Sequence, residues 1–390
     1  MNLKTYYLFS SNRGDIPVEK TILERPFVAR PLENHPFLTL GDFFEAIRLF
    51  IWQNQGRKLA RLLQNKQGSP VKPGDIGSLA IRYEKYGTLY HVISIEVGTQ
   101  KNRWKFALSV AQYRQARETL DREFHLLAHL HQKYDYPYIP QAYFKDTHEI
   151  KKGPHQETFL MALCGWFEGY HEWHFQKENN QAETAVIWDM EKGYQRATKQ
   201  EVCEIIRLAS KILTLYFDPN TFQRIDPWHH GAGDFVVKRE PKGVDVRLIT
   251  VRGYEPVVAF PADHTLSPGE GLLVFFLEMT IKMRLDKSEG MGSPLWASPI
   301  VIPPVLEGFL EALRLKEKLG DMGPFSVEAF IDHIQRLSEK KLHSKLVQLT
   351  RKYRFTDPQD FSCIRQHLKE HGLDLYRALL TFDKGTNTLS

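Results

Sequence analysis

The alternation of apolar and polar positions changes its period several times along this chain. Residues 1–38 show no regular repeat, and four prolines between positions 17 and 36 interrupt any long element. Between residues 41 and 64, apolar side chains such as Phe43, Ile47 and Ile51 recur at helical spacing and predict one helix. The turn-rich stretch 67–77 follows, so we expect an N-terminal extension with a helix over residues 1–75.

A period of two begins after residue 77. Strands are predicted at about 78–85, 89–97 and 103–111, the last with Trp104, Phe106 and Leu108 in alternation. Residues 115–134 have the pattern of a strong helix, and two further strands are predicted at 139–146 and 158–166. We therefore expect a β-rich domain with one helix over residues 76–166.

Helical spacing dominates after the stretch FEGYHEWHF, that is directly after residue 175. A helix is predicted at 199–217, and short strands are predicted near 235–237 and 244–251. Further helices are predicted at 267–286, 302–318, 325–337, 339–353, 358–370 and 372–381. The whole pattern predicts an α+β chain with two lobes, a small antiparallel-sheet lobe with one helix and a large helical lobe over residues 167–390.

Composition narrows the class of protein. An apolar fraction of 42% is typical of a folded chain. A net charge of +5 is compatible with nucleotide-like ligands but too small to indicate nucleic-acid binding. Cys164, Cys203 and Cys363 form no CxxC pair, which favours a reducing compartment. With no signal-peptide pattern and no apolar run near the roughly 20 residues of a membrane span, we expect a cytoplasmic protein.

The stretch RIDPWHHGAGDFVV, residues 224–237, combines acids, histidines and glycines directly before a β-branched, aromatic run. Such an arrangement is typical of a loop that presents polar groups at the entrance of a strand. It is compatible with a catalytic loop, with a metal site, or with a turn in which His229 and His230 bond backbone carbonyls. The residues alone leave these interpretations open.

Three strands, a helix, two strands, a helix, this loop with a hairpin and then helices form an order that resembles the protein-kinase-like superfamily. The pattern is most similar to aminoglycoside phosphotransferases and to kinases of lipopolysaccharide-core sugars, over residues 78–290. The resemblance implies a phosphotransferase that uses ATP and Mg²⁺ and takes a nucleotide and a small-molecule or sugar acceptor as partners.

The resemblance assigns roles in the β-rich lobe. Glu123 falls where an organising glutamate belongs and shares a helical face with Leu120, although Phe124 is an alternative inward residue. Ser109 stands in place of the phosphate-binding lysine. Lys105 lies on the same strand face, but roughly 13 Å away. Lys105 and Ser109 are therefore the candidate cofactor-binding positions of this lobe.

Four residues of the helical lobe also match positions of the kinase pattern. Asp234 opens the strand FVV and matches a metal-ligand position. Five residues earlier, His229 stands where the resemblance places the base aspartate, and Asp226 is the alternative base. Thr250 replaces the second metal-binding aspartate, and Arg252 is a candidate contact for an anionic cofactor. A lone carboxylate is a poor cage for magnesium.

These replacements predict a divergent kinase-like protein, either a pseudokinase or an atypical small-molecule or sugar kinase. A metal-dependent enzyme is an alternative, in which His171 and His174 share a helical face. The other ligands would then come from Glu172, His229, His230 and Asp234. A protein-binding scaffold without chemistry is the third interpretation.

Overall fold

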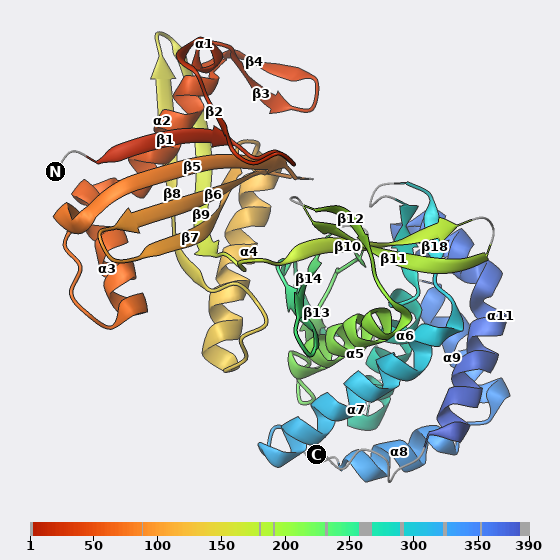
Figure 1. Ribbon diagram of the computed structural model, residues 1–390. Coiled ribbons are helices and arrows are strands. Elements are labelled where there is room, and N and C mark those ends of the chain that lie inside the picture. Colours follow the sequence, from red (N-terminus) through yellow and green to blue (C-terminus); the bar gives the residue numbers. More distant parts are fainter. Residues whose placement is uncertain are drawn as a thin grey trace. The chain divides into compact units, whose positions relative to one another are not determined.

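The computed structural model describes residues 3–87, 89–178, 181–189, 192–230, 233–256, 267–288, 292–322, 326–351 and 353–382. The chain divides into two compact units (Figure 1). Unit 1 is Met1–Glu168 with Met190–Lys192, and unit 2 is Gly169–Asp189 with Gly193–Ser390. The predicted α+β fold, with a sheet-rich part followed by a mainly helical part, is confirmed.

A seven-stranded sheet forms the centre of unit 1. In spatial order its strands are β2 (Ile16–Pro17), β1 (Lys4–Phe9), β5 (Ile76–Tyr86), β6 (His91–Thr99), β7 (Arg103–Ala111), β9 (His155–Gly165) and β8 (Ala142–Lys152). Strand β1 runs parallel to β5, and the other neighbours are antiparallel. A separate hairpin consists of β3 (Pro26–Arg30) and β4 (Glu33–Thr39).

The prediction that residues 1–38 are irregular is therefore wrong. The strands there are short, and β1 is defined by its pairing with β5, about 70 positions along the chain. Because these strands are short and pair with a distant segment, their sequence shows no clear alternation of apolar and polar residues. Residues 1–75 belong to the same compact unit as the predicted β-rich domain.

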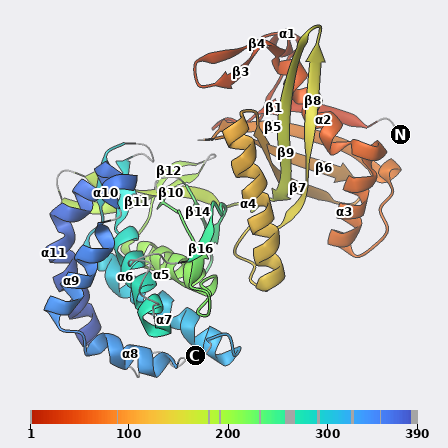
Figure 2. The ribbon, with the colours of Figure 1, turned by 180° about the vertical axis from the view of Figure 1, so that it is seen from behind.

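Helices cover both faces of this sheet (Figure 2). The helices α2 (Leu40–Ile51) and α3 (Arg57–Gln67) bury their apolar sides against one face. On the other face lies α4 (Arg114–Lys133), which packs against Leu160 and Ala162. The single helix predicted over 41–64 is wrong, because Asn54, Gln55 and Gly56 all have positive φ and break it.

Unit 2 contains a second, five-stranded antiparallel sheet. Its order is β12 (Gly193–Arg196), β11 (Gln181–Asp189), β10 (His171–Glu178), β14 (Phe235–Glu240) and β15 (Gly243–Leu248). The helical character expected directly after residue 175 is thus wrong. Trp173, Phe175 and Ile187 are buried, and the alternating period that places them on one face is that of strands.

Helices make up most of the rest of unit 2. They are α5 (Lys199–Leu215), α6 (Pro268–Lys282), α7 (Ile302–Lys318), α8 (Val327–Gln335), α9 (Glu339–Thr350), α10 (Tyr353–Thr356) and α11 (Pro358–Thr381). The helices predicted at 358–370 and 372–381 form the single helix α11. Two small strand pairs complete the described part, namely β13 (Gln223–Ile225) with β16 (Tyr254–Pro256) and β17 (Leu285–Lys287) with β18 (Pro294–Trp296).

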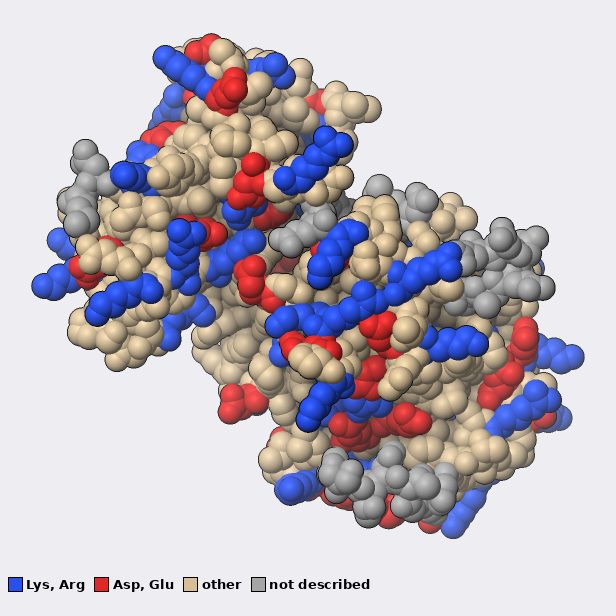
Figure 3. Space-filling model, viewed as in Figure 1, with Lys and Arg blue, Asp and Glu red and all other residues tan. Residues whose placement is uncertain are grey.

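The element order agrees in part with the order expected from the sequence, because strands β10, β11 and β12 stand between β9 and α5, where no strand was predicted. Strands β5, β6 and β7 precede α4, strands β8 and β9 follow it, and α5, the loop 226–234 and the hairpin β14–β15 come later. Basic and acidic side chains are interspersed on the face drawn in Figure 3, in keeping with the net charge of +5. Within the described residues, no helix is long and apolar enough to cross a membrane.

Candidate functional site

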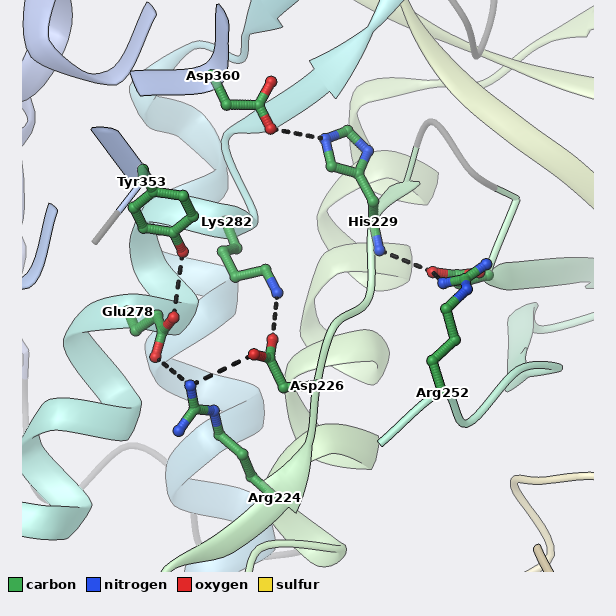
Figure 4. Close-up of polar contacts among 9 residues, drawn as sticks. Arg224, Asp226, His229, Arg252, Glu278, Lys282, Tyr353 and Asp360 are labelled. Atoms are coloured by element: carbon green, nitrogen blue, oxygen red, sulfur yellow. Dashed lines mark hydrogen bonds and ion pairs between the residues drawn. The ribbon is translucent and has the colours of Figure 1, made fainter. Parts of the chain in front are cut away.

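The candidate metal ligand Asp234 lies between β13 and β14, in a loop of which residues 226–230, 233 and 234 are described. Asp226 and His229 of this loop are labelled in Figure 4. The side chain of Asp234 is only 1% exposed. Its Oδ2 accepts from Nη1 of Arg252 at 2.6 Å and its Oδ1 from Nη2 at 2.7 Å, so the ion pair is bidentate. The backbone N–H of His229 also donates to Oδ2, at 2.8 Å. Both carboxylate oxygens of Asp234 thus contact protein donors.

Thr250 and Arg252 belong to the segment that follows β15, and this segment contacts Asp234. The N–H of Ile249 donates to the carbonyl oxygen of Asp234 at 2.8 Å, which ties the segment after β15 to the start of β14. Thr250 follows directly and supplies no carboxylate. The structure therefore brings together three positions that the sequence singled out, Asp234, Thr250 and Arg252, but with a guanidinium beside the single acid.

The alternative base, Asp226, is directed toward helix α6 (Figure 4). Its Oδ1 accepts from Nζ of Lys282 at 2.6 Å, and its Oδ2 lies 3.5 Å from Nη2 of Arg224. That same Nη2 donates to Glu278 at 2.8 Å, and the hydroxyl of Tyr353 donates to the other oxygen of Glu278 at 3.1 Å. Asp226 is part of a charge network that anchors the loop to α6.

The candidate base His229 faces the start of helix α11. Its Nε2 lies 3.8 Å from Oδ2 of Asp360. Burial lowers the pKa of His229 to about 4, and the positive charges of Lys282 and Lys287 act in the same direction. Burial raises the pKa of Asp360 to about 6, with Asp357 as a further cause. The imidazole is therefore neutral at pH 7 and is a weaker base than an ordinary histidine.

The other histidine of the pair, His230, is a core residue. It is 1% exposed, and its ring centroid lies 4.9 Å from Trp173 and 5.5 Å from Trp228. Burial holds its pKa well below the usual range. It packs against aromatic side chains, so of the two histidines only His229 is a base candidate.

The predicted sharing of one helical face by His171 and His174 is wrong. Both lie on strand β10, where residues three apart point to opposite faces. His171 approaches Asp189, at 3.8 Å between Nε2 and Oδ2. Among the residues that the structure describes, no three His, Cys, Asp or Glu side chains form a group that could hold a metal ion.

Glu123 lies in unit 1, on the inner side of α4. It is 6% exposed, and the hydroxyl of Tyr90 donates to its Oε2. Burial raises the pKa of the Cys164 thiol to about 12, and the charge of Glu123 contributes to that rise. Glu123 is thus an inward residue, while Phe124 packs at the edge of the same small core.

Lys105 and Ser109 lie on the β7 face that α4 covers, since Phe106 and Leu108 point into the opposite core. The ammonium of Lys105 lies 4.4 Å from the ring centroid of Trp166. Ser109 pairs with Val92 and Ala162 on the neighbouring strands. The resemblance implies a lysine as the partner of Glu123. The hydrogen bond that the structure describes for Glu123 comes instead from Tyr90.

Sequence reasoning missed four residues around these sites, namely Tyr90, Lys282, Tyr353 and Asp360. Arg224 stood in the quoted stretch, but its partner Glu278 lies 54 positions later. None of these residues belongs to a recognisable local motif. Only the folded chain brings them to the loop or to α4.

No family model and no curated protein matches this chain. Among solved structures, the chain is similar to one described as Rad53 1-466 in complex with AMP-PNP, with 12% sequence identity and a TM-score of 0.30. The match covers 60% of this chain and 53% of that chain, so it spans about half of the solved chain's length. This similarity is too distant to assign a family or an activity, and the fold described above rests on the chain's own topology.

Proposed function

We propose that this chain is a pseudokinase, a kinase-like protein that binds a ligand or a protein partner without transferring phosphoryl groups. The observation that carries the proposal is the state of its two candidate acids. Asp226 is paired with Lys282 at 2.6 Å, and Asp234 is paired with Arg252 at 2.6 and 2.7 Å. Neither carboxylate is available to take a proton from an acceptor or to hold magnesium, as phosphoryl transfer in this fold requires.

Two further features support the absence of phosphoryl transfer. Burial and nearby cations keep His229 neutral with a pKa of about 4, which disfavours proton abstraction at neutral pH. Ser109 cannot supply the positive charge that a lysine gives to nucleotide phosphates. The organising role expected for Glu123 is replaced by a contact with a neutral hydroxyl of Tyr90.

An assay of phosphoryl transfer tests this proposal. Labelled ATP or GTP is supplied with Mg²⁺ or Mn²⁺ and a panel of aminoglycosides, simple sugars and water as acceptors. We expect no product above that of the Asp226→Asn, His229→Gln double variant. Transfer that disappears in this variant but persists in Asp321→Asn, an exposed acid after α7, would establish an enzyme instead.

Thermal stability then separates two kinds of pseudokinase. A ligand that binds only the folded state raises stability by RT ln(1 + [L]/Kd). A shift of Tm with ATP in the absence of turnover supports a nucleotide-binding pseudokinase. No shift with ATP, GTP or ADP supports a protein-binding scaffold.

An atypical small-molecule or sugar kinase is the second candidate function. The approach of Asp360 to the ring of His229 favours it, because a carboxylate beside an imidazole can stabilise the imidazolium that forms when the base takes a proton. In that case Asp360→Asn lowers transfer in the assay above. Phosphoryl transfer at the wild-type rate in Asp360→Asn would show that Asp360 does not assist His229 as a base.

A further inference from the structure

The kinase resemblance implies a magnesium ion between two carboxylates, and the residues present do not fit that ion. One of the two positions is Thr250, whose hydroxyl carries no charge. At the other, the guanidinium of Arg252 contacts both oxygens of Asp234, at 2.6 and 2.7 Å. Together with the N–H of His229, the guanidinium takes three of the roughly four acceptor sites of this carboxylate, so a divalent cation would have to displace or compete with Arg252.

We propose that Arg252 is a resident cation, which neutralises Asp234 and fixes it beside the backbone of His229 in the place of a divalent metal. The inference rests on the proposed function and extends it, because it makes the folded loop independent of Mg²⁺. It also implies a latent site. Removal of the Arg252 side chain leaves a buried acid that a divalent cation can neutralise.

The burial of Asp234 shows why a counter-charge is necessary there. At 1% exposure, an isolated carboxylate would lose its hydration and destabilise the fold. Arg252, at 27% exposure, reaches it from the surface side with a planar fork that matches the two oxygens. The N–H of His229 supplies a third donor at 2.8 Å. The arrangement satisfies the charge of Asp234 without a metal.

The same contacts join three segments of unit 2. Asp234 begins β14, Arg252 follows β15, and His229 lies in the loop between β13 and β14. The backbone bond from Ile249 to the carbonyl of Asp234, at 2.8 Å, reinforces this junction. Arg252 is therefore a positioning residue for the loop as well as a counter-charge.

A second carboxylate lies close to the latent site. A Cβ atom on Gly233 would lie 2.9 Å from Cδ of Glu172, so the Glu172 carboxylate packs against the residue directly before Asp234. Oxygen ligands from carboxylates suit Mg²⁺ and Mn²⁺. Without the guanidinium, Asp234 would be the acidic ligand at this place, with the Glu172 carboxylate against the neighbouring residue Gly233.

Thermal unfolding without nucleotide tests this inference, with Mn²⁺ as the probe. We expect the Tm of the wild type to be the same with Mn²⁺ or with a chelator. Arg252→Ala should unfold about 5 °C lower, since it leaves a buried charge without its partner. Mn²⁺ should restore at least half of that loss. The Asp234→Asn, Arg252→Ala double variant should show no response to Mn²⁺.

Three results would overturn the inference. One is a stabilisation of the wild type by Mn²⁺ that Asp234→Asn abolishes, because the site would then take metal with Arg252 present. Another is a folded Arg252→Ala protein with no response to Mn²⁺. If Arg252→Ala does not fold, the Asp234→Asn, Arg252→Ala double variant provides the test. A folded double variant supports charge neutralisation by Arg252. A double variant that also fails to fold is the third contradicting result. No nucleotide is present in these unfolding measurements. Phosphoryl transfer by the wild type would therefore refute the proposed function, whereas the response to Mn²⁺ would still test the role of Arg252.

Discussion

At the scale of single residues, the buried carboxylate of Glu123 accepts a hydrogen bond from the hydroxyl group of Tyr90. This glutamate is 6% exposed on the inner side of α4, where an acid without hydrogen-bond donors would be costly. Tyr90 donates to it from the turn between β5 and β6. The helical stripe of α4 was readable from the sequence, but the identity of this partner was not, because a turn residue carries no periodic signal.

Replacement of Tyr90 by phenylalanine tests that contact. The ring is kept, and the buried carboxylate loses a donor, so we expect a loss of about 1–3 kcal/mol in the free energy of unfolding. Urea denaturation measures it. The matched control is Tyr194→Phe, at a residue 64% exposed, which should change stability by less than about 0.5 kcal/mol. Equal losses in the free energy of unfolding for the two variants would show that the Tyr90 hydroxyl does not stabilise the buried Glu123 carboxylate.

At the scale of elements, the contact between α5 and α7 depends on the absence of a side chain. A Cβ atom on Gly308 of α7 would lie 1.9 Å from the carbonyl oxygen of Arg207 on α5. Near the other end of α7, the buried Lys316 donates to the carbonyl oxygen of Leu215 at 3.0 Å, at the C-terminus of α5. The two helices are held close by a small residue and by a charge-assisted cap.

Gly308→Ala should therefore destabilise the protein, although helix propensity alone predicts the opposite sign. Propensity favours alanine by about 1 kcal/mol in a helix interior. Overpacking against Arg207 should outweigh it and give a net loss of about 1–3 kcal/mol in urea denaturation. Ser344→Ala, at an exposed position of α9, is the control and should change little. A stabilised Gly308→Ala variant would mean that α5 and α7 can move apart at no cost.

At the scale of the whole molecule, buried histidines govern the response to acid. Burial lowers the pKa of His91 and of His229 to about 4 and that of His371 to about 3, where Arg284 contributes. Their unfolded value is about 6.5. The folded state then binds fewer protons than the unfolded chain, so stability is fully present above pH 6.5 and falls as the pH drops toward 4. Asp360 opposes this, because its raised pKa of about 6 favours the folded state as it becomes protonated.

We expect the free energy of unfolding to decrease from pH 7 to pH 4.5. Burial also lowers the pKa values of His230 and His148, and these histidines together outweigh Asp360, Asp286 and Glu307, the acids whose pKa values burial raises. His371→Gln keeps a polar side chain near Thr280 and Arg284 but cannot bind a proton, so the decrease should be smaller in this variant. Chemical denaturation at pH 7, 5.5 and 4.5 measures both proteins. Identical pH dependence in the two would show that His371 does not contribute to acid unfolding.

Local patterns explain why much of the fold was predictable. The alternation over Trp104, Phe106 and Leu108 marks β7, and the capping pair Thr198 and Glu201 begins α5 at the expected place. The failures have two causes. The strands before residue 40 depend on contacts with a distant segment, as in the pairing of β1 with β5. The break before α3 is local, because Asn54, Gln55 and Gly56 have positive φ, and two of these residues are not glycine.

The sequence by itself determined the α+β class, the strands β5 to β9 around α4, and the position of Asp234 at the entrance of β14. These features follow from periodicity and from neighbouring residues. Only the tertiary structure decided which charges meet. Asp234 could have faced a metal ion or solvent, and Asp226 an acceptor, but the fold places Arg252 against the first and Lys282 against the second. The physical reason is that an ion pair depends on distances of a few ångströms between segments that are far apart along the chain.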